Sequence, residues 1–105
     1  MKLTQTELLE LHDALSETAR DIMRAKNTDY TAGGGVFANF DLSEQLGIPR
    51  ELGLLLRVQD KLQRLRSFID SGTLAVKDES ATDAVLDIIN YMILLAGMIK
   101  EAGHE

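Results

Sequence analysis

The sequence predicts an all-α protein: an antiparallel helical bundle of three long helices plus a short helical turn, completed by oligomerisation. Apolar residues recur every three or four positions along three long segments, which is the period of an amphipathic helix. No segment alternates apolar and polar residues, and β-branched residues are few outside the apolar stripes, so a sheet is not expected. A chain of 105 residues has the size of one domain, and we expect residues 1–105 to form a single helical domain.

The first helix is expected to start after Thr4 and to end near Asn27. Thr4 and Glu7 have the spacing of a capping box, in which each side chain accepts a hydrogen bond from the backbone of the other residue. The apolar stripe of this helix consists of Leu8, Leu11, Leu15, Ile22 and Met23. The next segment, TDYTAGGGVFANF at 28–40, is expected to be irregular because ordering three consecutive glycines costs backbone entropy.

A helical turn and two further long helices are expected after the glycines. The turn covers 41–46, and Pro49 is suited to be the first residue of a second long helix that runs to about Asp70. Asp78 can cap a third helix, which continues to about Ala102. The apolar stripes are Leu55, Val58, Leu62, Leu65 and Ile69 in the second helix, and Val85, Ile88, Met92, Leu95 and Ile99 in the third.

The small size of the chain favours self-association, because a domain of this length buries only a moderate share of its surface. We therefore expect a homodimer or a higher homo-oligomer with closed symmetry.

The charge and composition exclude several classes of function. The net charge of −6 argues against binding to long nucleic acids, since phosphate neutralisation dominates that affinity. Eight of the eleven lysines and arginines nevertheless lie within 20–66, so a small phosphorylated ligand can meet positive charge there. The absence of cysteine excludes disulfides, thiolate metal sites and cysteine nucleophiles.

We expect a cytoplasmic protein with no membrane partner. The first residues, MKLTQTELLE, lack the apolar core of a signal peptide. The longest uninterrupted apolar run, 91–99, is too short to cross a bilayer.

An acidic ladder is predicted along the third helix. Glu79, Asp83 and Asp87 lie one turn apart and share a helix face with Asn90. Solvation and the helix dipole account for Glu79 and for Asp83 near the start of the helix. Asp87 lies in the most apolar part of the helix, which favours a functional or buried role for the ladder. The alternative is a solvated helix face without function.

Charged residues also share one face of the second helix, and an antiparallel arrangement would place this face beside the acidic ladder. Carboxylate oxygens are the ligands that Mg²⁺ prefers, often together with substrate phosphates. The expected metal ligands are Asp60, Glu79, Asp83 and Asp87, of which Glu79, Asp83 and Asp87 are also the candidate catalytic residues that position an attacking water. The cations expected to meet phosphates are Arg57, Lys61 and Arg64. The alternative for Asp60 and Arg64 is an ion pair within the helix.

The glycine-rich segment and its flanks form the second half of the predicted site. It lacks the lysine and serine or threonine of a Walker phosphate loop. We expect it to be a lid that closes over a nucleotide, with contacts from Lys26, Asp29, Tyr30, Phe37 and Asn39, together with Asn90 on the third helix. The alternative is a linker whose two phenylalanines fill the end of the bundle.

Four short blocks of the sequence resemble a known family. They are K-x-x-D-Y at 26–30, N-F at 39–40, R-x-x-D-K-x-x-R at 57–64, and E-S-x-x-D-x-x-x-D-x-x-N-Y at 79–91. In combination they resemble the nucleotide-modification-associated domain, type one, a family of small phage and prophage proteins. The resemblance covers about 26–95 and implies a phage protein linked to the synthesis of modified nucleotides, located in the host cytoplasm.

A more distant likeness is to the MazG-like all-α nucleoside triphosphate pyrophosphatases, which hold magnesium with two pairs of acids on neighbouring helices. Asp87 and Asn90 are similar to the second pair, whereas Arg57 and Asp60 stand where the first pair has two glutamates. This likeness therefore implies a nucleotide site more strongly than it implies hydrolysis.

The expected function is nucleotide binding, with Mg²⁺-dependent pyrophosphatase activity on a nucleoside triphosphate or a modified nucleotide. One alternative is a protein that sequesters a nucleotide or a cyclic-nucleotide signal without cleaving it, as an anti-defence sponge would. The other is a structural helical adaptor, in which the polar residues only fix how the helices pack.

Overall fold

The computed structural model describes residues 1–30, 35–72 and 80–104, and for residues 27–30 the backbone only. Within these ranges the chain is helical and contains no strand, so the all-α prediction is confirmed. The helices are α1 (Gln5–Tyr30), α2 (Ala38–Asp41), α3 (Arg50–Ser71) and α4 (Ala81–Glu101), with a 3-10 helix, η1 (Leu42–Leu46), between α2 and α3. The sequence led us to expect three long helices plus one short turn, and the described residues add the separate helix α2.

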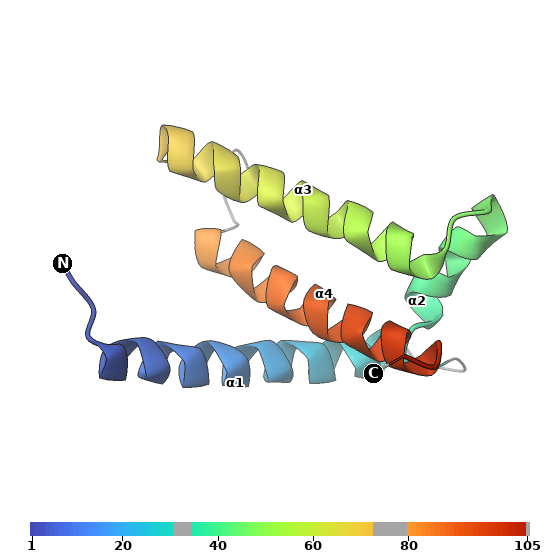
Figure 1. The fold of residues 1–105 in the computed structure, drawn as a ribbon, viewed down its shortest axis with the longest axis horizontal. Helices are drawn as coiled ribbons and strands as arrows, with labels where there is room; N and C mark the ends of the chain where they lie inside the picture. The colour runs from blue at the N-terminus through green and yellow to red at the C-terminus, as the bar shows by residue number, and fades with distance from the viewer. Residues whose placement is uncertain (31–34, 73–79, 105) are drawn as a thin grey trace.

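Helix α4 lies between α1 and α3 and packs against both (Figure 1). Helices α3 and α4 are antiparallel, as expected, whereas α1 and α4 run in roughly the same direction. Helices α1 and α4 converge toward their C-terminal ends, and the first turns of α1 extend away from the other helices. The segment of α2 and η1 lies at this convergent end, where α3 begins.

The start of α1 follows the predicted capping box. The Thr4 backbone N–H donates to Glu7 Oε1 over 3.0 Å, and the Glu7 N–H donates to Thr4 Oγ1 over 3.1 Å. These hydrogen bonds from Thr4 lower the pKa of Glu7. The helix continues to Tyr30, beyond the expected end at Asn27.

The start of α4 differs from the prediction, because its cap is Ser80 and not Asp78. Ser80 and Asp83 form a second capping box: the Ser80 N–H donates to Asp83 Oδ2 over 2.9 Å, and the Asp83 N–H donates to Ser80 Oγ over 3.0 Å. The spacing Ser-x-x-Asp satisfies two backbone donors at once, which a lone aspartate further upstream cannot do. Pro49 likewise proves to be the residue before α3 and not its first helical residue.

The core forms where α2 packs against α3 and α4. It consists of Phe37, Phe40, Leu54, Val58 and Met98, with Tyr91, Leu94 and Leu95 packed against it. We expected irregular structure over 28–40, but burying two aromatic rings stabilises the fold by roughly 1.5–3 kcal/mol each and orders the end of this segment as a helical turn.

Arg50, the first residue of α3, connects α2 with α3 and α4. Its guanidinium donates to Asp41 Oδ1 in α2 and to Glu101 Oε1 at the end of α4, each over 3.3 Å. It also lies over the ring of Phe37, 5.0 Å from the ring centre. The Arg50 side chain therefore connects the start of α3 to the segment that carries the two buried phenylalanines.

Half of the ten residues in the apolar stripes predicted for α3 and α4 are exposed, namely Leu55, Leu62, Ile69, Met92 and Ile99. The buried residues of α4 are instead Ala84, Leu86, Asn90 and Met98, which lie on a different face of the helix.

By length and composition alone, α4 is also the one helix among the described residues that could cross a membrane, with a mean hydropathy of 1.6 over its most apolar window. A core helix of a soluble protein satisfies the same test, and the window is 22% buried here.

Gly97→Ala is expected to destabilise the protein even though alanine favours helices. A Cβ at position 97 would lie 2.8 Å from Cζ of the buried Phe37 ring, so the ring has to move. The gain in helix propensity is about 1 kcal/mol, and we expect the loss of Phe37 packing to exceed it. Urea unfolding followed by circular dichroism measures the net change.

The matched control for this prediction is the same substitution in a Phe37→Leu background. Leucine removes the ring atoms that the new methyl group would contact, so Gly97→Ala should become neutral or stabilising there. Equal destabilisation in both backgrounds would show that the contact with Phe37 is not the cause.

Candidate functional site

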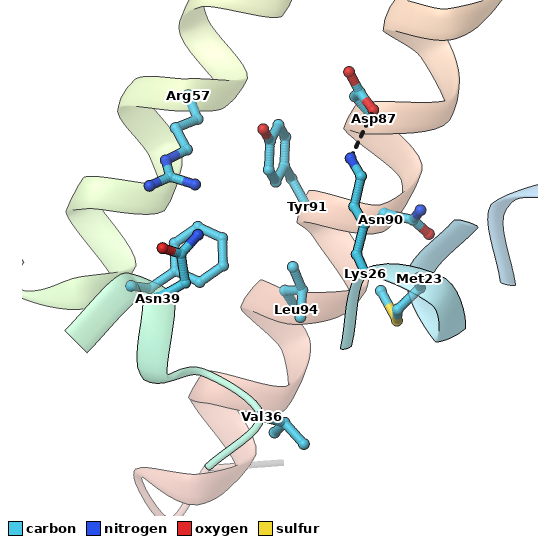
Figure 2. Close-up of a pocket in the computed structure, with 10 residues that line it drawn as sticks. Met23, Lys26, Val36, Asn39, Arg57, Asp87, Asn90, Tyr91 and Leu94 are labelled. Carbon is cyan, nitrogen blue, oxygen red and sulfur yellow. Dashed lines mark ion pairs between the residues drawn. The ribbon is translucent and has the colours of Figure 1, made fainter. Parts of the chain in front are cut away.

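A pocket of about 190 Å³ lies between α1, α2, α3 and α4 (Figure 2). Tyr91 projects between its two charged sides, with Arg57 and Asn39 on one side and Lys26 and Asp87 on the other. The lining residues are Met23, Lys26, Val36, Asn39, Phe40, Arg57, Asp87, Asn90, Tyr91 and Leu94. The pocket thus combines an apolar and aromatic wall with cations.

The aromatic wall is formed by Phe40 and Tyr91. Their rings meet edge to face, with centres 6.4 Å apart and planes at 90°. The guanidinium of Arg57 lies over the face of Phe40, 4.6 Å from the ring centre. A cation over an aromatic face is attracted by the negative charge of the ring. This contact holds Arg57 at the pocket, and within the described residues no carboxylate pairs with it.

Asp87 joins three helices at the charged side of the pocket. Lys61 Nζ, from α3, lies 2.9 Å from Asp87 Oδ2. Lys26 Nζ, from α1, lies 3.8 Å from Asp87 Oδ1. The side chains of Lys61 and Asp87 are mostly buried, whereas Lys26 is largely exposed. The structure therefore brings together three of the residues that the sequence singled out.

The local charge of the site is positive although the chain carries −6 overall. Among the residues that line the pocket, Lys26 and Arg57 supply two cations and Asp87 supplies one carboxylate, which leaves one positive charge in excess. Such an excess in a partly enclosed pocket attracts small anions, because field lines are concentrated there.

Asn90 lies at the contact between α4 and α1 and is 8% exposed. Its Nδ2 donates to the backbone carbonyl of Ala19 over 2.9 Å. A carbonyl can only accept, so this bond fixes the orientation of the amide and leaves Oδ1 as an acceptor. Among the described residues, no donor lies within hydrogen-bonding distance of this buried Oδ1.

The carboxylate of Asp83 takes part in the capping box of α4. The hydrogen bonds from the Ser80 backbone and side chain lower the pKa of its carboxyl group, and the nearby charge of Lys61 lowers it further. Asp83 is exposed and does not line the pocket, but it lies one turn before Asp87 on the same face of α4.

The remaining predicted site residues are dispersed. Asp60 pairs with Arg64 within α3 over 3.3 Å, and neither lines the pocket. Phe37 is buried in the core and faces Gly97, so it does not line the pocket either. Glu79 lies outside the described residues, as do the side chains of Asp29 and Tyr30.

The fit of the site to Mg²⁺ rests on two carboxylates. Among the residues that the structure describes, no three acidic, histidine or cysteine side chains converge on one point. Asp83 and Asp87 remain, and Mg²⁺ is commonly held by one or two carboxylates together with substrate phosphates. These residues therefore suit an ion that arrives with a phosphorylated ligand better than a resident ion.

Sequence reasoning missed several lining residues. Phe40 and Tyr91 stood in the blocks that carry the family resemblance, N-F and N-Y, but we did not include them among the site residues. Met23, Val36 and Leu94 gave no signal, because apolar residues of a helix or loop are expected in a core. Only the packing of α1 and of the α2 segment against α4 places them around one space.

Comparisons of the chain with protein-family models, with curated proteins and with solved structures give no match. The function therefore has to be inferred from the geometry and charge of the pocket.

Asp83→Ala is expected to destabilise the protein at neutral pH and to lose this effect in acid. The folded pKa of Asp83 lies below its usual value of 3.8, so the ionised carboxylate adds stability above that value. This contribution disappears as the pH falls through the folded pKa. Urea unfolding of wild type and variant from pH 7 down to about pH 3 measures it; a difference that is constant over this range would contradict the assignment.

Proposed function

We propose that the protein binds a small nucleotide in the pocket between the four helices. The observation that carries this proposal is the combination of an aromatic wall with two cations and one carboxylate, an excess of one positive charge, in one pocket. The resemblance to the nucleotide-modification-associated domain, type one, points to the same ligand class and remains a prediction. We place the activity in the cytoplasm, and in the host cell if the chain is phage-encoded.

The phosphate groups would lie between the two charged sides of the pocket, within reach of Arg57 on one side and Lys26 on the other. Arg57 is held over Phe40 and keeps its guanidinium donors available, and a planar guanidinium suits bidentate recognition of phosphate. Lys26 is exposed and its contact with Asp87 is long, so its ammonium can turn to an anion at little cost. Lys61 forms an ion pair with Asp87, so it would attract the phosphate groups mainly through its positive charge.

The base or sugar would lie against Phe40 and Tyr91, with Asn39 and Asn90 as polar contacts. The volume of about 190 Å³ is below the ~300 Å³ of typical ligand pockets, so part of the ligand would extend to the surface. The buried Oδ1 of Asn90 favours a ligand with an N–H or O–H donor, because an unsatisfied buried acceptor costs ~1–3 kcal/mol.

Arg57→Gln is expected to weaken nucleotide binding by roughly 10- to 100-fold, the equivalent of losing hydrogen bonds to a charged group worth ~1.5–3 kcal/mol. Isothermal titration with a panel of nucleoside mono-, di- and triphosphates and cyclic nucleotides measures this change. Arg66→Gln is the matched control, because Arg66 is on the same helix, exposed, and outside the pocket. Equal binding by wild type and both variants, or no binding to any nucleotide, would overturn the proposal.

Hydrolysis by a Mg²⁺-dependent pyrophosphatase mechanism is the second candidate. The observation in its favour is that Asp83 and Asp87 lie one turn apart beside a pocket with phosphate-binding cations. Bound Mg²⁺ would neutralise phosphate charge and activate a water. The pairing of Asp87 with two lysines favours binding over hydrolysis, since it lowers the negative charge available to a metal ion.

The double variant Asp83→Asn and Asp87→Asn separates the two candidates. If the protein is a hydrolase, nucleotides incubated with Mg²⁺ should be cleaved by wild type and not by the double variant, while circular dichroism shows an intact fold. If it sequesters its ligand, wild type should retain the nucleotide intact with or without Mg²⁺. Chromatography of the incubated nucleotide distinguishes these two outcomes. If the nucleotide is neither cleaved nor retained, the result favours the structural adaptor.

We also propose that the protein functions as a homo-oligomer. Many leucine and isoleucine side chains among the described residues are more than one-third exposed, including members of all three predicted apolar stripes. Exposure on this scale in a short chain favours burial against further copies.

A further inference from the structure

Helices α3 and α4 each carry a stripe with the spacing of a coiled-coil seam. The intervals alternate between three and four residues, which is the pattern that packs side chains of one helix into holes on another. The ten seam positions are Leu55, Val58, Leu62, Leu65 and Ile69 on α3, and Val85, Ile88, Met92, Leu95 and Ile99 on α4.

The chain itself covers only one edge of each seam. Val58 is buried and Leu65, Ile88 and Leu95 are half-buried, because they lie near the contact between α3 and α4. Val85 is half-buried as well. The other five positions are exposed. Their exposed fractions are 42% for Leu55, 52% for Leu62, 78% for Ile69, 38% for Met92 and 36% for Ile99.

The two seams lie on the same side of the α3–α4 hairpin. The contact between Lys61 and Asp87 marks the pocket side of this hairpin. Leu62 follows Lys61 and Ile88 follows Asp87, each about 100° further around its helix. In an antiparallel pair, both rotations lead away from the pocket toward the opposite face. The seams therefore combine into one apolar face that points away from the pocket and α1.

This face approaches a standard interface in size. Its ten residues together expose on the order of 600 Å², most of the roughly 800 Å² per partner that a stable interface buries. None of the ten is charged, and the carboxylate of Glu51 lies at one end of the α3 seam, one turn before Leu55. A face with the same spacing on two antiparallel helices is also complementary to a copy of itself.

We infer that a second copy of the chain covers this face, so that two α3–α4 hairpins form a four-helix bundle about a two-fold axis. An isologous contact of this kind closes on itself and leaves no seam open. Each pocket then faces outward from the bundle. This inference concerns assembly only, and it does not depend on whether the pocket binds a nucleotide.

The test is the mass of the full chain in solution, by sedimentation equilibrium over a concentration series. We expect twice the chain mass of 11.6 kDa for wild type. The double variant Leu62→Glu and Met92→Glu should shift to the mass of one chain. The control Leu46→Glu should keep the wild-type mass, because Leu46 is 81% exposed on η1 and outside the face.

Engineered cysteines make the test independent of whether the glutamate variant folds. The chain has no cysteine, so Leu62→Cys with Met92→Cys introduces the only thiols. Mild oxidation should link two chains through these positions, which lie at the middle of the seams, and much faster than Leu46→Cys links them. A wild-type monomer at all concentrations, or equal cross-linking at the control position, would overturn the inference. A monomer that binds lipid vesicles or another protein through the face would overturn it too.

Discussion

The carboxylate of Asp87 is the point at which the three long helices meet. It lies in the middle of an apolar helix, where an unpaired charge would be strongly unfavourable. Lys61 approaches it closely from α3 and Lys26 more loosely from α1, so one charge holds contacts with both neighbours of α4. The relative positions of the helices, and with them the pocket, depend on this cluster.

The cluster also explains why an acidic protein has a positively charged pocket. A half-buried ion pair does little for stability by itself, since desolvation offsets much of the attraction. Lys26 and Arg57 line the pocket against the single carboxylate of Asp87, which leaves one positive charge in excess, and Arg57 lies over Phe40. The surrounding aromatic and apolar groups reduce the screening of this positive charge by solvent. The excess charge therefore acts at short range on a ligand that enters the pocket. The residues that connect the helices thus also contribute to the positive charge of the pocket.

The sequence was informative where the physical signal is local. The capping box at Thr4 and the helical periods of the long segments depend on residues within a turn or two of each other. The acidic ladder is a pattern of the same kind, but Glu79 lies outside the described residues and the role of the ladder stays a prediction. The cap at Ser80 was within reach of the same reasoning, because Ser-x-x-Asp precedes the apolar run. Asp78, the predicted cap, lies outside the described residues.

The signals that failed are those that depend on packing. Helix α2 forms because Phe37 and Phe40 pack against Leu54, Val58 and Met98. The sequence left this open as the alternative in which two phenylalanines fill the end of the bundle, and both rings are buried there. The apolar stripes of α3 and α4 were expected to form the core, but periodicity does not say whether a stripe faces the same chain or another copy. Phe37 was predicted to contact the nucleotide for a related reason. An aromatic residue beside glycines is equally compatible with stacking on a base and with burial in the core.

The hydrogen bond from Asn90 to the carbonyl of Ala19 requires the backbone of α1 to come close to α4, and Ala19, with its single methyl group, is almost completely buried there. Lys26 follows Ala19 by two turns on the same face of α1. The small side chain of Ala19 therefore determines how close α1 comes to α4, although Ala19 does not line the pocket. The distance between the two helices in turn determines how far the Lys26 ammonium reaches toward the pocket.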